Sequence, residues 1–214
     1  MGDLAVSKKK NKQQQQQFYL DTNVFISRFK ADDPYWAEAR AIISGLGDGD
    51  ILAETSVLTL LEVASVSGRL YEARKGNNEE EEEEENGKRK KKMIFVIRML
   101  RRLAELKPKF INISGDTPIS VSGIQASLPS VFNEAILLSL QSNLRTLDLI
   151  HLAAARYAKM MNGELGAFVT GDKEFLSKKK ELYEIIGMPI LSPKEYVESF
   201  GLKLNRQARK PNPA

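Results

Sequence analysis

The chain alternates between short apolar segments and longer segments with a helical spacing of apolar residues. Apolar runs of strand length occupy residues 18–20, 51–53, 110–113 and 167–169. Apolar residues three and four positions apart predict helices over about 34–47, 56–73, 93–106, 131–140, 146–161 and 192–200. Because short buried strands that alternate with helices are typical of parallel sheets, the pattern predicts a mostly parallel sheet covered by helices on both faces.

Local signals mark several ends of these elements. Asn23 is a capping residue type and predicts a turn of helix after the first strand. Pro34 suits the first position of the next helix, and Ser192 with Glu195 forms a capping-box pattern before the last one. Residues 114–129, rich in Gly, Ser and Pro, form a long connection that we expect to be ordered for a purpose.

Composition along the chain predicts one domain with charged additions. Residues 1–17 combine lysines and glutamines without periodicity, so we expect them to be disordered. Residues 18–200 hold the predicted elements and form the domain. Within it, residues 75–92 contain an unbroken glutamate run at 79–85 and a basic block at 88–92, which predicts an inserted linker between two helices of a hairpin. Residues 201–214 form a basic tail.

The residue types exclude several kinds of site. The 214 residues include no cysteine and one histidine, which excludes disulfides, thiolate zinc sites and multi-histidine metal centres, so a metal would be held by oxygen. No secretory signal and no run of membrane-spanning length are found, and we expect a cytoplasmic protein with no membrane contact. The net charge of +4 favours polyanionic partners, although charge runs are also common on solvated surfaces.

Four carboxylates are placed where an α/β sheet gathers its ligands. Asp21 and Asp172 each follow a predicted strand within a few residues. Glu62 lies early in the helix after the second strand, and Asp148 lies in the first turn of a helix. Since ligands bind beyond the carboxyl ends of parallel strands, these side chains are predicted to share one rim if the first and last strands are neighbours.

Each carboxylate also has an ordinary structural explanation. Asp172 can cap the short helix after it, and Asp148 can favour the positive end of a helix dipole. Thr59 and Glu62 match a capping box, and Asp21 can simply end a strand.

Clustering of the four acids would carry an electrostatic cost that a cation removes. Two like charges about 4 Å apart repel by roughly 1 kcal/mol in water and about 4 kcal/mol at an effective dielectric of 20. A divalent cation reverses the sign of this interaction, and oxygen ligands suit Mg²⁺ or Mn²⁺. Such a metal polarises a phosphodiester and activates water, so the pattern points to phosphodiester hydrolysis.

Four segments in this order, YLDTNVFI, TLLEVASV, RTLDLIHLAAA and AFVTGDKEF, resemble the acidic motifs of PIN-domain nucleases, including VapC-type toxins. The resemblance covers about residues 18–200 and implies a three-layer α/β/α sandwich. It also implies metal-dependent endonucleolytic cleavage of RNA that leaves a 5′-phosphate, and a homodimer. By matching motifs, it implies that Mg²⁺ or Mn²⁺ is held by Asp21, Glu62, Asp148 and Asp172, with Asn23 and Thr170 as supporting polar residues.

Several alternatives stay open at this point. The charged additions depart from the compact toxin pattern, so both a toxin with a cognate antitoxin or inhibitor and an RNA-processing nuclease are compatible with the sequence. A haloacid dehalogenase-type phosphatase would use Asp21 as nucleophile, but Asn23 stands where a second acid is needed. A non-catalytic module that binds RNA or protein is a third interpretation.

Three further positions near the motifs have both a functional and a packing interpretation. His151 lies one helical turn after Asp148, and packing is the favoured interpretation over general-base catalysis. Arg145 can contact phosphate or solvent. Tyr35 and Trp36 can stack on a base, although helix packing is the favoured interpretation.

Overall fold

The computed structural model describes residues 17–75, 85–111, 115–121, 124–163, 165–202 and 204. Its centre is a five-stranded sheet in which each pair of neighbouring strands is parallel. The spatial order of the strands is β3 (Lys109–Ile111), β2 (Leu52–Ser56), β1 (Gln17–Leu20), β6 (Leu165–Val169) and β7 (Ile190–Leu191). The first and last predicted strands, β1 and β6, are therefore neighbours.

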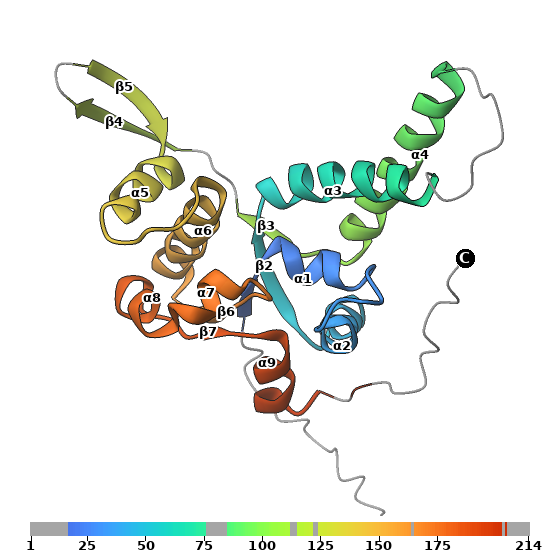
Figure 1. Cartoon of the computed structure of the whole chain (residues 1–214). Coiled ribbons are helices and arrows are strands. Elements are labelled where there is room, and N and C mark those ends of the chain that lie inside the picture. Colours follow the sequence, from blue (N-terminus) through green and yellow to red (C-terminus); the bar gives the residue numbers. More distant parts are fainter. Residues whose placement is uncertain are drawn as a thin grey trace, which may run out of the picture.

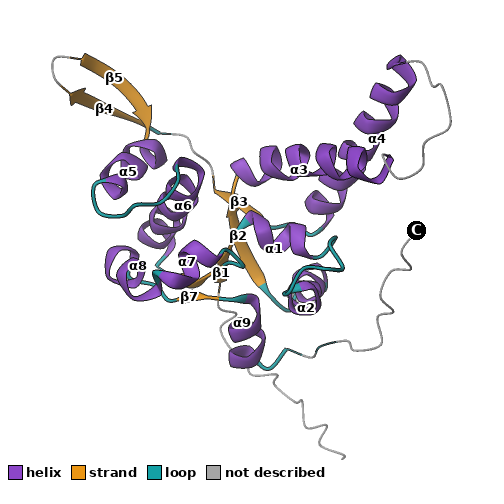
Figure 2. Cartoon of the chain, viewed as in Figure 1, coloured by secondary structure: helices purple, strands orange, loops and turns teal. Residues whose placement is uncertain are grey.

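Helices cover both faces of this sheet, as the figures show (Figures 1 and 2). One face packs against α1 (Thr22–Ser27), α2 (Trp36–Gly47), α3 (Leu58–Lys75), α4 (Glu85–Glu105) and α9 (Pro193–Phe200). The other packs against α5 (Ser130–Ser139), α6 (Thr146–Asn162), α7 (Lys173–Ser177) and α8 (Lys179–Ile186). The predicted three-layer α/β/α sandwich with a mostly parallel sheet is confirmed.

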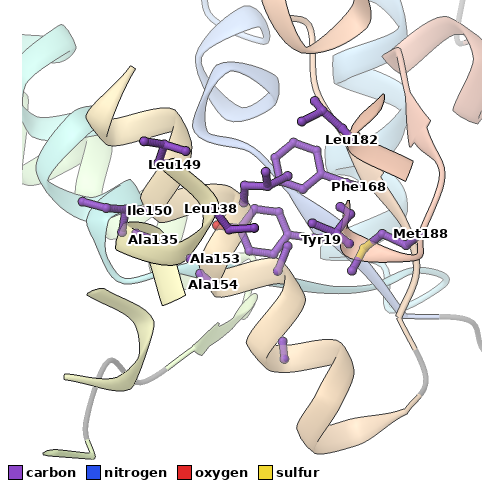
Figure 3. Packing of buried hydrophobic residues seen from close by; sticks show 14 of the residues in the cluster. Tyr19, Ala135, Leu138, Leu149, Ile150, Ala153, Ala154, Phe168, Leu182 and Met188 are labelled. Atoms are coloured by element: carbon purple, nitrogen blue, oxygen red, sulfur yellow. The ribbon is translucent and has the colours of Figure 1, made fainter. Parts of the chain in front are cut away.

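The alternation of side chains along the central strands produces two cores. Phe18 and Leu20 of β1 pack on the α2 side, whereas Tyr19 between them packs on the α6 side. The ring of Tyr19 stacks on Phe168 of β6 at a centroid distance of 4.9 Å, and both are fully buried (Figure 3). Because both faces of the sheet are covered, consecutive strand residues are apolar, which explains the continuous apolar runs in the sequence.

Some predicted helix ends are wrong for identifiable reasons. The residue that caps α1 is Asp21, whose carboxylate accepts from the Thr22 backbone, and Asn23 lies inside the helix. Helix α2 begins at Trp36 rather than at Pro34. The capping box of α9 is confirmed, with Ser192 and Glu195 in reciprocal hydrogen bonds.

Two segments differ from the prediction more strongly. The basic block 88–92 is not a linker but the start of α4, since Lys and Arg are good helix formers. The connection before α5 contains a β-hairpin of β4 (Asp116–Val121) and β5 (Ile124–Pro129), which projects from the domain beside α5 (Figure 1). Pro118 obscured this hairpin in the sequence, yet a two-stranded ribbon tolerates proline because one side of each strand is unpaired.

Three predictions lie wholly or mostly outside the described residues. They concern the N-terminal segment 1–17 apart from residue 17, the central part 76–84 of the charged insertion, and the basic tail at 203 and 205–214. Among the helices in the described ranges, none combines the length and the apolar character needed to cross a lipid bilayer.

Candidate active site

The ends of β1 and β6 bring the first and last acidic motifs together. Leu20 pairs with Val169 in the parallel register, and the Asp21 backbone N–H donates to the Val169 carbonyl at 3.0 Å. Asp21 therefore starts its loop at the same level of the sheet as Thr170. The carboxyl edge of the sheet is where the sequence predicted a ligand site.

Asp21 is held in place by donors to both carboxylate oxygens. Its Oδ1 accepts from the Thr22 backbone N–H at 2.6 Å, and its Oδ2 accepts from Thr170 Oγ1 at 2.7 Å and from Asn23 Nδ2. Asp21 is 6% exposed. Burial raises the pKa of Asp21 above its ordinary value, and the charge of His151 and the hydrogen bond from Thr170 offset only part of this rise.

Asn23 and Thr170 connect the two loops as well as contacting Asp21. Asn23 Nδ2 donates to Thr170 Oγ1 at 2.9 Å, and Asn23 Oδ1 accepts from the Gly171 N–H at 2.7 Å. Thr170 Oγ1 also accepts from the Asp172 N–H at 3.0 Å. The two residues expected to support the site thus lock the β1 loop to the β6 loop around the Asp21 carboxylate.

Glu62 reaches the same region from α3. The predicted capping box with Thr59 is wrong, because Thr59 lies inside α3 and bonds Thr22 and Thr55, while Glu62 points to other partners. Glu62 Oε2 accepts from His151 Nε2 at 2.7 Å and from Thr22 Oγ1. Burial raises the pKa of Glu62, but these two hydrogen bonds and the charge of His151 outweigh it and lower the pKa overall.

His151 connects Glu62 to the core. Its ring is 1% exposed, and its Nδ1 lies 2.7 Å from the hydroxyl of Tyr19. Since a carboxylate only accepts, Nε2 carries the proton toward Glu62, and in the neutral ring Nδ1 accepts from Tyr19. Burial lowers the pKa of His151, but the bond to Glu62 and the nearby carboxylates raise it overall. His151 is buried as predicted, and it also orients Glu62.

Asp148 and Asp172 complete the group of acids. Asp148 lies in the first turn of α6, and Asp172 caps α7 by accepting from the N–H groups of Glu174 and Phe175 at 2.6 and 3.4 Å. The capping role of Asp172 therefore coexists with its place at the site. Burial and the charges of Asp172, Asp21 and Glu174 raise the pKa of Asp148 to about 6.

Most of these side chains line one pocket, which has a volume of about 740 Å³. Buried Asp21 does not line it, yet its charge acts on Asp148. Glu174 and Thr22 were missed in the sequence, because their roles depend on contacts with distant segments. The residues lining the pocket are Asn23, Ser27, Asp33, Pro34, Tyr35, Glu62, Arg145, Thr146, Leu147, Asp148, Gly171, Asp172, Lys173 and Glu174.

The donor chemistry of this pocket fits a hard divalent cation. Its acids are carboxylates, and burial together with the neighbouring acids raises the pKa of Asp148, so a bound cation would stabilise its ionised form. Glu62 Oε1 and Asp172 Oδ2 form no hydrogen bond with other described residues. Each of these two carboxylates therefore has one oxygen that can bind a cation. Within the described ranges, no three His, Asp or Glu side chains converge tightly enough to enclose an ion as they stand.

Comparison with known proteins agrees with the predicted fold family. The family model of the PIN domain matches residues 18–117, which include Asp21 and Glu62. No curated protein and no solved structure matches the chain. PIN domains are generally metal-dependent nucleases that act on RNA or DNA, so the match supports a nuclease rather than a phosphatase. With the α/β/α sandwich and the acids at the carboxyl edge of its sheet, this match assigns residues 18–117 of the chain to the PIN-domain nuclease family.

Proposed function

We propose that this protein is a Mg²⁺- or Mn²⁺-dependent endoribonuclease that hydrolyses RNA phosphodiester bonds in the pocket. The observation that carries the proposal is that Glu62, Asp148 and Asp172 line one pocket beside buried Asp21. These four acids would hold the metal. When bound, the metal supplies positive charge that polarises the phosphodiester and lowers the pKa of water.

The residues around the acids hold them in position for this task. Thr170 and Asn23 fix the plane of the Asp21 carboxylate through Oδ2. His151 and Thr22 fix Glu62 through Oε2, so that Oε1 is the oxygen with which Glu62 would bind a metal. Such fixed orientation reduces the reorganisation that binding and catalysis require.

Arg145 gives the pocket a positive group for the substrate. It is exposed, it lines the pocket, and it directly precedes α6, on which Asp148 lies. A guanidinium binds phosphate through paired N–H donors, so Arg145 suits a phosphate beside the bond that is cleaved.

The biological role and the assembly are separate proposals. The same chemistry serves a VapC-type toxin neutralised by an antitoxin and an RNA-processing nuclease. The homodimer implied by the resemblance is checked by the mass of the protein in solution, measured by light scattering.

Cleavage of end-labelled RNA tests the proposed activity. Wild type is incubated with Mg²⁺ or Mn²⁺, with EDTA, and with a DNA of the same sequence. We expect metal-dependent internal cleavage of RNA that leaves 5′-phosphates, and a fall of more than about 100-fold in Asp148→Asn, the size seen when one electrostatic group of an active site is removed. Exposed Asp32 provides the control, since Asp32→Asn should cleave like wild type.

Two outcomes would contradict the proposal. Cleavage that persists in EDTA or in Asp148→Asn would show that the pocket acids do not carry the activity. Hydrolysis of p-nitrophenyl phosphate without cleavage of RNA would identify a phosphatase instead.

A further inference from the structure

Three arginines gather where α1, α2 and α4 meet. Arg28 follows α1, Arg40 lies in α2, and Arg102 lies in the last turn of α4. Burial lowers the pKa of Arg28, and the positive charges of Arg40 and Arg102 lower it further. The three guanidinium groups are therefore close enough for each charge to act on Arg28.

The packing of Arg28 supports this placement independently. Arg28 lines a small cavity together with Ile43 of α2 and with Met99 and Leu103 of α4. Its side chain thus lies where α1, α2 and α4 meet. Ile43 is one helical turn from Arg40, which places Arg40 on the side of α2 that faces this cavity. Arg102 lies in the same turn of α4 as Leu103, and its charge acts on Arg28.

Aromatic rings, rather than acids, contact two of these guanidinium groups. Arg40 lies over the ring of Trp36 at 4.7 Å, and Arg28 lies over Phe29 at 5.7 Å. In the ranges that the structure describes, none of the three arginines forms a salt bridge with Asp or Glu. Like charges gathered without a counter-charge repel each other, and a bound anion would remove this repulsion.

Two of the arginines are close in the chain to residues that line the pocket. Ser27 lines the pocket and is followed by Arg28, and Tyr35 lines it and is followed by Trp36, the ring under Arg40. On α4, exposed Arg98 is one turn from Arg102 and adds a further positive charge to that part of the helix. An RNA strand that leaves the pocket past Ser27 or Tyr35 would meet these arginines.

We propose that Arg28, Arg40 and Arg102 form a binding site for backbone phosphates of the RNA strand next to the cleaved bond. The proposal rests on the proposed nuclease function, which places the cleaved bond of the RNA in the pocket. Guanidinium groups match phosphate oxygens in geometry and charge, and the contact with the ring of Trp36 restrains the side chain of Arg40. Because the ligand is the backbone, this site contributes affinity without reading the RNA sequence.

Binding of fluorescein-labelled single-stranded RNA, followed by anisotropy in EDTA, tests this site without cleavage. We expect each Arg→Gln change to weaken binding by about tenfold, the effect of removing one charged hydrogen bond. In Arg28→Gln/Arg102→Gln, the slope of log K against log salt should decrease by about 0.7 for each phosphate that the protein no longer neutralises. Arg28→Lys/Arg102→Lys keeps both charges and should retain most of the affinity.

A charge-matched control and a small substrate separate this site from the pocket. Lys180 is exposed on α8, on the other face of the sheet, and Lys180→Gln should bind RNA like wild type. Bis(p-nitrophenyl) phosphate lacks the neighbouring backbone phosphates that this site would bind, so Arg28→Gln/Arg102→Gln should raise the KM for RNA much more than it changes the hydrolysis of this small substrate.

The outcomes are distinguishable. Wild-type affinity and an unchanged salt slope in the double Gln variant, with its circular dichroism spectrum intact, would overturn the proposed phosphate site. Inorganic phosphate can also be added to each protein while its melting temperature is measured. If phosphate raises the melting temperature of wild type but not of the double Gln variant, and both bind RNA equally well, the arginines bind a free anion. That result would also overturn the proposed site for RNA phosphates. RNA that binds through the arginines but is never cleaved would support this site and refute the proposed nuclease.

Discussion

Asp148→Asn should stabilise the metal-free protein at neutral pH. Burial and the charges of Asp172, Asp21 and Glu174 raise the pKa of Asp148 from 3.8 to about 6. Between these two pH values the folded state keeps a proton that the unfolded state has released, so the stability of wild type falls as the pH rises and the decrease is complete above about pH 6. Asparagine never ionises and avoids this decrease.

The size of the effect follows from the same shift. A change of pKa from 3.8 to about 6 corresponds to about 3 kcal/mol if it is fully expressed. Asp148 is only partly buried, and water around it screens the repulsion. The asparagine also forgoes about 0.5 kcal/mol of favourable interaction with the dipole of α6. We therefore expect a net gain of about 1–2 kcal/mol at pH 7, or about 2–8 °C in Tm for a chain of this size.

Urea denaturation in EDTA at pH 4 and pH 7 measures this difference. The two proteins should have similar free energies of unfolding at pH 4, and Asp148→Asn should be more stable at pH 7. Asp32→Asn, an exposed change, should match wild type at both pH values. If Asp148→Asn is less stable than wild type at pH 7, or if the difference does not change with pH, mutual repulsion of the acids is not a property of this site.

Three further changes test the supports of the site and of the fold. His151→Ala removes the hydrogen bond to Glu62 and should lower kcat for RNA by about 10–100-fold with little change in KM; an unchanged kcat would show that His151 only fills the core. Gly171→Ala places a methyl group 3.1 Å from the ring of Tyr35 and should cost about 1 kcal/mol in urea denaturation. Adding Tyr35→Ala should remove that penalty, and equal penalties in the single and double variants would contradict the contact. Ser192→Ala breaks the capping box of α9 and should cost about 1 kcal/mol while leaving RNA cleavage unchanged.

The parts of the fold that local patterns determine were predictable from the sequence. The apolar runs of β1 and β6 identify strands covered on both faces, and the alternation with helices identifies a parallel sheet. The capping box at Ser192 was also predictable, because its two partners are three residues apart. In the same way, Asp21 and Asp172 could be placed at the sheet edge, since each follows its strand within a few residues.

Features that depend on distant partners were not predictable. Asn23 and Asp21 are both good capping types, but Asp21 caps α1 and the side chain of Asn23 instead bonds Thr170 and Gly171 of the distant β6 loop. The orientation of Glu62 depends on His151, which is 89 positions away. Arg28, Arg40 and Arg102 belong to separate parts of the sequence, so no pattern of spacing along the chain predicts that they lie together.

Calorimetric titration with Mn²⁺ tests the central claim, that the acids of this pocket bind a divalent cation. Wild type should show saturable binding at pH 7. At pH 6, where Asp148 is about half protonated, binding should release about half a proton, seen as a heat that depends on the buffer. Asp148→Asn should bind more weakly and should not show this proton release. An absence of binding in wild type, or equal binding and equal proton release in Asp148→Asn, would contradict the account.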